Sequence, residues 1–131
     1  MRSICSKIHA GFTLVELIVA VAIIAILASI ALPSYEETLQ RSRRSEAREA
    51  LSDFAARQEQ FYLDNKTYST TISALGRSAT TENGYYVISI PSANALTYTL
   101  RATAQAPQNK DTECAAMDIT SRGNRSPADC W

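Results

Sequence analysis

Apolar residues are concentrated near one end of the chain. Between Leu14 and Leu32 the polar residues are Glu16 and Ser29. At ~1.5 Å per helical residue, this stretch is long enough to cross a ~30 Å hydrocarbon core. An acid at the centre of a membrane span costs roughly 2.5–3.5 kcal/mol, so Glu16 needs an explanation of its own. We expect a helix whose first half lies in a membrane or against other apolar helices.

After Pro33 the pattern becomes amphipathic. Apolar or small residues recur at helical spacing, and charged residues occupy the opposite face. The apolar stripe comprises Leu39, Ala47, Ala50, Leu51, Phe54, Ala55, Phe61 and Tyr62. Proline lacks a backbone donor and its ring conflicts with the carbonyl of Ser29, so we expect a bend at Pro33. A single helix is predicted from about Phe12 to about Leu63.

The remainder of the chain has the pattern of β-strands. Residues 85–90 are β-branched and aromatic, and residues 95–104 alternate between apolar and polar. We expect residues 91–94 to form the hairpin turn between these strands, residues 114–120 to form a third strand, and residues 122–129 to be loop.

The alternating strand has one apolar face, formed by Leu96, Tyr98, Leu100 and Ala102. A half-apolar strand needs a cover, and the apolar stripe of the helix is the candidate. The prediction is an α+β fold, in which the second half of a long N-terminal helix packs against an antiparallel sheet of three or four strands.

The distribution of charges indicates the orientation of the chain in a membrane but gives little information about a ligand. The 131-residue chain has a formal net charge of zero, which gives no overall electrostatic case for nucleic acid. Residues 1–10 carry Arg2 and Lys7 and no acid, so this end is expected in the cytoplasm and the bulk of the chain across the membrane. A secretory signal peptide fits less well, because the apolar run is too long and no small-residue cleavage site follows it.

The cysteines indicate an exported domain. Cys5 lies in the basic leader, whereas Cys114 and Cys130 lie near the C-terminus. Two cysteines in an exported domain indicate a disulfide, with two unpaired thiols as the alternative. A metal site has no support, because no histidine or second cysteine pair lies near them in the sequence.

Catalytic residues are not evident. The one histidine, His9, lies in the leader, so the abundant Ser and Thr residues lack a base; we predict no enzyme and no cofactor. Residues 41–48, RSRRSEAR, are compatible with a phosphate-binding patch, but a solvated or inter-subunit helix face is favoured.

Two explanations of Glu16 remain open. An acid near the start of a helix gains from the macrodipole. Alternatively, cleavage between Gly11 and Phe12 leaves an α-amino group on Phe12, which meets Glu16 of the next helix in a staggered array. In an apolar surround, losing one partner of such a pair leaves a buried charge. Repeated contacts of this head-to-tail kind build filaments.

The short basic leader, the residues GFTLVE from Gly11 to Glu16 and the apolar helix resemble the class III signal of type IV pilins and pseudopilins. The resemblance implies that a prepilin peptidase cleaves after Gly11 and N-methylates Phe12. It also implies that Glu16 neutralises the terminal amine of a neighbouring subunit and that the helix bends or partly melts at Pro33. Cys114 and Cys130 match the disulfide-bounded C-terminal loop of the family.

The first half of the chain is most similar to PilE-like minor pilins. One departure is Ala25, where many members have glycine. Alanine favours helix by roughly 1 kcal/mol over glycine, so melting ahead of Pro33 should be reluctant.

The resemblance implies three parts: a leader (1–11), a transmembrane and assembly half of the helix (12–34), and a globular part with the amphipathic half and the sheet (35–131). The implied function is that of a structural subunit of a type IV pilus, in pilus assembly, twitching motility or adhesion. Its expected partners are other pilin subunits, the prepilin peptidase and the inner-membrane assembly platform. The chain is expected in the inner membrane with its C-terminal domain in the periplasm, and then in the extracellular pilus.

Two alternative functions remain. A pseudopilin of a type II secretion system shares the N-terminal signal, but the acids Asp111, Glu113, Asp118 and Asp129 are too scattered to argue for the calcium site of many pseudopilins. A minor pilin that binds DNA or a surface is the other alternative. The residues that favour it are Arg101, Lys110, Arg122 and Arg125, which form no clear stripe.

Overall fold

The computed structural model describes residues 11–131 of the chain. The chain divides into two compact units between Glu37 and Thr38. We describe each unit by itself. Residues 1–10 of the expected leader lie outside the described residues, so the leader stays a prediction.

One helix, α1 (Leu14–Asn65), contributes to both units, close to the predicted range of 12–63. The helix continues without interruption through Pro33. At the C-terminal end, Lys66 has a φ of 57° and its backbone N–H donates to the carbonyl of Tyr62 at 2.8 Å. A left-handed residue of this kind ends a helix because its N–H satisfies one of the last free carbonyls.

The first unit consists of the apolar part of α1. Its large side chains are exposed, with Ile18 at 59% and Ile30 at 69%. Within the described residues, α1 is the one helix long and apolar enough to cross a membrane. So much exposed apolar surface in a continuous run marks a segment that needs lipid or other apolar helices around it.

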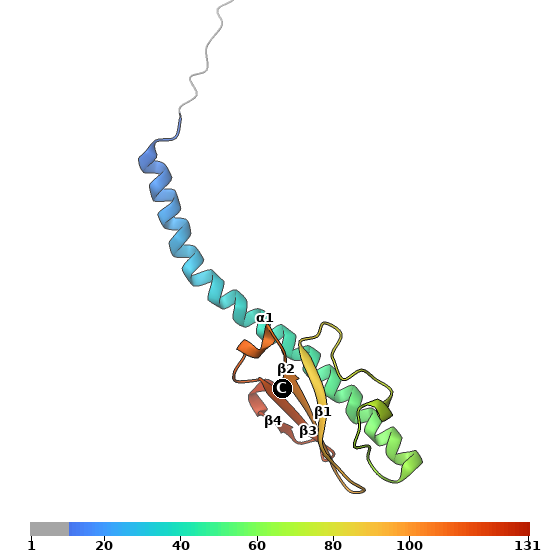
Figure 1. Cartoon of the computed structure of the whole chain (residues 1–131). Helices are drawn as coiled ribbons and strands as arrows, with labels where there is room; N and C mark the ends of the chain where they lie inside the picture. Colours follow the sequence, from blue (N-terminus) through green and yellow to red (C-terminus); the bar gives the residue numbers. More distant parts are fainter. Residues whose placement is uncertain (1–10) are drawn as a thin grey trace, which may run out of the picture. The chain divides into compact units, whose positions relative to one another are not determined.

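The second unit is a sheet packed against the second half of α1 (Figure 1). Its strands are β1 (Tyr86–Ala93), β2 (Tyr98–Ala104), β3 (Ala116–Thr120) and β4 (Arg125–Ser126). Neighbouring strands are antiparallel, in the order β1-β2-β3-β4. The predicted α+β class and the antiparallel sheet are confirmed.

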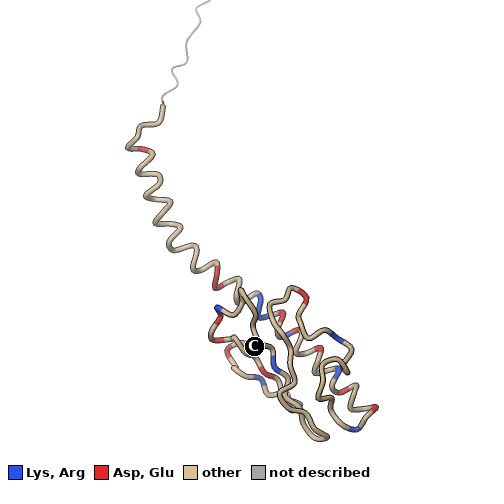
Figure 2. Tube along the Cα trace, in the orientation of Figure 1, with Lys and Arg blue, Asp and Glu red and all other residues tan. Residues whose placement is uncertain are grey.

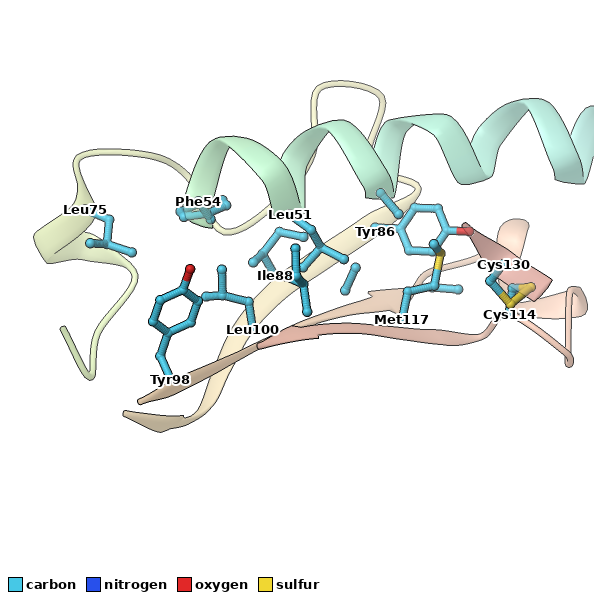
Figure 3. Packing of buried hydrophobic residues seen from close by; sticks show 14 residues of the cluster. Leu51, Phe54, Leu75, Tyr86, Ile88, Tyr98, Leu100, Cys114, Met117 and Cys130 are labelled. Atoms are coloured by element: carbon cyan, nitrogen blue, oxygen red, sulfur yellow. A yellow bond between two sulfur atoms is a disulfide. The ribbon is translucent and has the colours of Figure 1, made fainter. Parts of the chain in front are cut away.

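The core lies between α1 and one face of this sheet (Figure 3). Ala47, Leu51, Phe54 and Gln58 of α1 are buried, at the three- and four-residue spacing of one helix face. They meet the inward residues of β2, which alternate with exposed ones. Ile88 of β1 and Met117 of β3 extend the same layer. The amphipathic half of the helix therefore provides the cover that the half-apolar strand required.

The hairpin between the first two strands differs from the prediction. Residues 91–93, expected in the turn, belong to β1, whose register with β2 shifts between Ser89 and Ser92. The turn forms around Asn94, whose Oδ1 accepts the N–H groups of Leu96 and Thr97 at 2.7 and 2.9 Å. Leu96 is therefore at the hairpin tip and 83% exposed, and its predicted place on the apolar face is wrong.

The C-terminal segment also differs from the prediction. Residues 122–129 were expected to be loop, but they include β4 and the start of a 3-10 turn, η3 (Ala128–Cys130). Asp118 and Ile119 of β3 pair with Ser126 and Arg125. This short strand gives the sheet its fourth member.

Candidate functional site

The expected cleavage point lies ahead of the helix. Gly11, Phe12 and Thr13 are not helical, and the Phe12 side chain is 79% exposed. An added Cβ at Gly11 would meet nothing within 4 Å in the described structure. The Gly11–Phe12 peptide bond thus lies in an exposed segment outside the helix, where a peptidase could reach it.

Glu16 lies in the first turn of α1. Its backbone N–H donates to Thr13 Oγ1 at 3.2 Å, so Thr13 caps the helix. Within the described residues the structure gives the Glu16 carboxylate no ion pair, and the side chain is exposed among apolar neighbours. In Figure 2 the apolar part of the helix has the colour of uncharged residues, apart from a short acidic stretch near its start. An acid in the first turn gains from the helix macrodipole, and an apolar surround would make an unpaired carboxylate costly.

Thr13 was missed in the sequence analysis. The signal was available, because Thr or Ser followed three residues later by Glu is the pattern of a capped helix start. Its effect is to begin the helix at Leu14, two residues after Phe12, and so to fix where Glu16 lies relative to the expected cleavage point.

Pro33 leaves one carbonyl of α1 without its helical donor. Because proline has no N–H, residue 33 cannot donate the helical hydrogen bond that the carbonyl of Ser29 would accept. The Ser29 hydroxyl donates a hydrogen bond to the carbonyl of Ile26 at 2.7 Å. A missing bond at this position weakens the helix locally, in the place where the family resemblance implies bending.

Cys114 and Cys130 form a disulfide, as predicted. Both are buried, and the bridge joins the segment ahead of β3 to η3 near the C-terminus. It encloses β3 and β4, so the short terminal strand is held by a covalent link as well as by its pairing with β3.

The arginines of residues 41–48 do not form one patch. Arg44 pairs with Asp111, and Arg43 lies over the ring of Tyr85 at 4.6 Å. Both contacts are made within the chain, so a phosphate would have to compete with them. The favoured interpretation of the segment as a solvated or inter-subunit face also needs correction for Arg44, since only 15% of its side chain is exposed.

The four cations that favoured DNA binding do not form one patch either. Arg101 pairs with Asp118 on the neighbouring strand, and Arg125 lies over the ring of Trp131 at 4.8 Å. Lys110 lies in the 3-10 turn η2 (Gln108–Lys110), and Arg122 lies in the β3–β4 connection. In the described part of the chain, no group of three or more His, Cys, Asp or Glu residues could hold a metal ion.

Comparisons with known proteins agree with this architecture. The family described as "Type IV minor pilin ComP, DNA uptake sequence receptor" matches residues 33–118, and the "Prokaryotic N-terminal methylation motif" matches residues 6–32. The chain belongs to the type IV pilins. Members of this family are structural subunits that assemble with other pilins into a filament, and this chain is such a subunit.

Individual relatives give the same result. The fimbrial protein EcpC of Eikenella corrodens is 36% identical over 76% of this chain and 68% of its own length. PilA4, a wide pilus major component of Thermus thermophilus, is 36% identical over 65% of this chain and 67% of its own. The type IV major pilin PilA of Myxococcus xanthus is matched over only 34% of its length.

A solved type IV pilin from Shewanella oneidensis shares the fold. Its TM-score is 0.55 at 29% identity, and the match covers 70% of this chain and 97% of that one. These relatives are pilins and fimbrial proteins by name, which supports a pilus subunit over the alternative of a secretion pseudopilin. The family also implies that the pilin is anchored in a membrane before it enters an extracellular pilus.

Proposed function

We propose that this pilin is cleaved after Gly11, N-methylated on Phe12, and docked into the filament through Glu16. The observation that carries the proposal is the Glu16 carboxylate, which has no ion pair among residues 11–131 and lies in the first turn of an exposed apolar helix. Cleavage would create an α-ammonium on Phe12, the same few residues from Glu16 in every copy. The methylation motif that matches residues 6–32 covers all of these positions.

The pairing would act between subunits. Once apolar helices exclude water, an ammonium and a carboxylate attract strongly, and each becomes costly to bury without the other. Pairing between the amine of one subunit and Glu16 of the next therefore favours a single offset between neighbouring subunits along the filament axis. Leaders would be removed by a prepilin peptidase, and an inner-membrane platform would extract each subunit from the lipid.

The arrangement in the envelope follows from the charges around the apolar segment. Arg2 and Lys7 precede it without an acid, which supports a cytoplasmic N-terminus and a periplasmic position for residues 35–131. The disulfide between Cys114 and Cys130 fits an oxidising compartment.

Replacement of Glu16 tests the proposal. Glu16→Ala should give a membrane protein that is stable and cleaved, but its content in sheared filaments should fall by about tenfold or more, because a buried amine loses its partner. Glu36→Ala, which removes another exposed acid of α1, is the matched control and should enter filaments normally. Normal incorporation of the Glu16→Ala protein would exclude this role.

A second candidate function is recognition of DNA by the filament-exposed unit. The supporting observation is the match over residues 33–118 to a family described as a DNA uptake sequence receptor. The chain's zero net charge and the internal contacts of Arg101 and Arg125 weaken the electrostatic case.

Titration of short duplex DNA against the full-length protein tests this second function. A receptor should show an apparent affinity that falls steeply with salt and that is lost when Arg122 and Arg125 are both replaced by Ala. Arg101→Ala removes a cation from the same sheet, and its effect on DNA affinity is the comparison. Absence of salt-dependent binding would leave filament assembly as the proposed function.

A further inference from the structure

The connection between α1 and β1, residues 66–85, is fastened to the helix at Glu46. One carboxylate oxygen of Glu46 accepts the backbone N–H of Asn83 at 3.1 Å, and the other accepts Asn83 Nδ2 at 3.0 Å. Burial alone would raise the pKa of Glu46, but hydrogen bonds from Thr81 and Asn83 outweigh it and lower the pKa. At neutral pH, the two hydrogen bonds from Asn83 are therefore accepted by a charged carboxylate.

The segment just ahead of Asn83 covers the outer edge of β1. Thr80 forms a bridge with Val87, and the N–H of Ile88 donates to the carbonyl of Ala79 at 2.7 Å. Because β1 is the terminal strand of the sheet, these contacts occupy backbone groups that have no neighbouring strand. An uncovered strand edge is a template for pairing with another chain.

Asn83 is followed by Gly84, and an Asn–Gly pair can deamidate through a succinimide. The backbone nitrogen of Gly84 can attack Cγ of Asn83, forming a five-membered succinimide and releasing the side-chain nitrogen as ammonia. Water then opens the ring, giving either aspartate or isoaspartate. Glycine has no Cβ to hinder the attack. The other asparagines of the chain precede residues with a side chain; they are Asn65, Asn94, Asn109 and Asn124.

The folded structure restrains this reaction at an exposed position. The attacking N–H of Gly84 donates to the carbonyl of Thr81 at 3.0 Å, and the departing amide of Asn83 is held by Glu46. After the reaction, the new carboxylate has no N–H to donate and faces the carboxylate of Glu46. Two like charges at this distance repel, and isoaspartate also lengthens the backbone of the turn.

We propose that Asn83 is a site of spontaneous deamidation restrained by Glu46, and that its conversion releases the turn from α1 and uncovers the edge of β1. The inference does not depend on the processing or docking of the N-terminus.

Incubation of the purified full-length protein at neutral pH tests the first step. Tryptic digestion gives one peptide, Ser78–Arg101, that contains both Asn83 and Asn94, so Asn94 is an internal control. We expect a mass gain of about 1 Da with isoaspartate at Asn83 and none at Asn94. Glu46→Ala should raise the rate about tenfold, the effect of losing one charge-assisted bond on a local opening.

Glu49→Ala is the matched control, since Glu49 and Glu46 line one pocket beside the 66–85 connection and Glu49 has no hydrogen bond to Asn83 among the described residues. It should leave the rate unchanged. An unmodified Asn83 in the Glu46→Ala protein, or equal modification of Asn83 and Asn94, would overturn the proposal.

The structural consequence is tested with Asn83→Asp. Hydrogen exchange of the Ile88 amide, which donates to Ala79, should become about tenfold faster because its cover detaches. Adding Glu46→Gln to this variant should restore the slow exchange, since donor and acceptor are then reversed and the like charges are gone. Unchanged exchange in Asn83→Asp, or no recovery in the double variant, would contradict the release of the turn.

Discussion

Arg44 of α1 and Asp111, which lie far apart in the sequence, form an ion pair with two parallel hydrogen bonds. Arg44 Nε lies 2.7 Å from Asp111 Oδ2, and Arg44 Nη2 lies 2.8 Å from Oδ1. The Asp111 side chain is 2% exposed, and its Oδ2 also accepts a bond from the buried Gln108. The pair therefore fixes the segment between β2 and β3 to the helix, close to the start of the disulfide-bounded region.

Removing Arg44 should destabilise the second unit. Arg44→Ala leaves a buried carboxylate without its charge partner, and we expect unfolding to become easier by about 3 kcal/mol. Chemical denaturation of the full-length protein in detergent measures the change.

Arg101→Ala is the matched control for Arg44→Ala. Its ion pair with Asp118 also has two bonds, but 45% of the Arg101 side chain is exposed. Its loss should cost at most about 1 kcal/mol. Equal costs for the two variants would show that burial does not set the strength of the Arg44 pair.

Reduction of the disulfide should also weaken this unit. The bridge closes a loop between positions 16 residues apart, which corresponds to about 3 kcal/mol in the chain-entropy description. Replacing Cys114 and Cys130 together by Ser should lower the denaturation midpoint and increase exchange of the β4 amides first. If β4 stays as protected as in the parent protein, the bridge does not hold that strand.

Alkaline pH should destabilise the fold through Tyr98. Burial, followed by the nearby Glu59 and Tyr68, raises the pKa of Tyr98 from 10.0 to about 12. A raised folded-state pKa gives stability that is complete below pH 10 and is lost as the pH rises through about 12.

Tyr98→Phe isolates this effect. The variant should lose less stability than the parent protein between pH 10 and pH 12. Burial raises the pKa of Tyr86 as well, so the alkaline loss should shrink without vanishing. Parallel pH profiles for the two proteins would rule out Tyr98 as a source of the loss.

The elements that could be predicted are those whose signals are local. The helix range follows from one continuous pattern, and the alternation from Tyr98 to Ala104 places β2 correctly. The predicted turn is misplaced because proline favours turns, and Pro91 lies in β1 instead. Proline is also tolerated at a bulge in an edge strand, and Pro91 lies where the register of β1 shifts.

The contacts that fasten the second unit could not be predicted from the sequence. Arg44 was one of several arginines in a charged run, and nothing local distinguishes it as the partner of Asp111. Gln58 occupies a position on the apolar stripe because its amide bonds both backbone groups of Ser69, at 2.9 and 2.8 Å. Such pairings depend on where the chain returns, which only the tertiary structure gives.

Mass spectrometry of the N-terminal peptide, in sheared surface filaments and in membranes separately, tests whether the subunit is cleaved after Gly11 before it enters the pilus. We expect the protein in the filament fraction to begin at N-methylated Phe12, with Gly11 and the residues before it absent. Filaments that contain the protein with an uncleaved Gly11–Phe12 bond would contradict both the processing and the role given to Glu16.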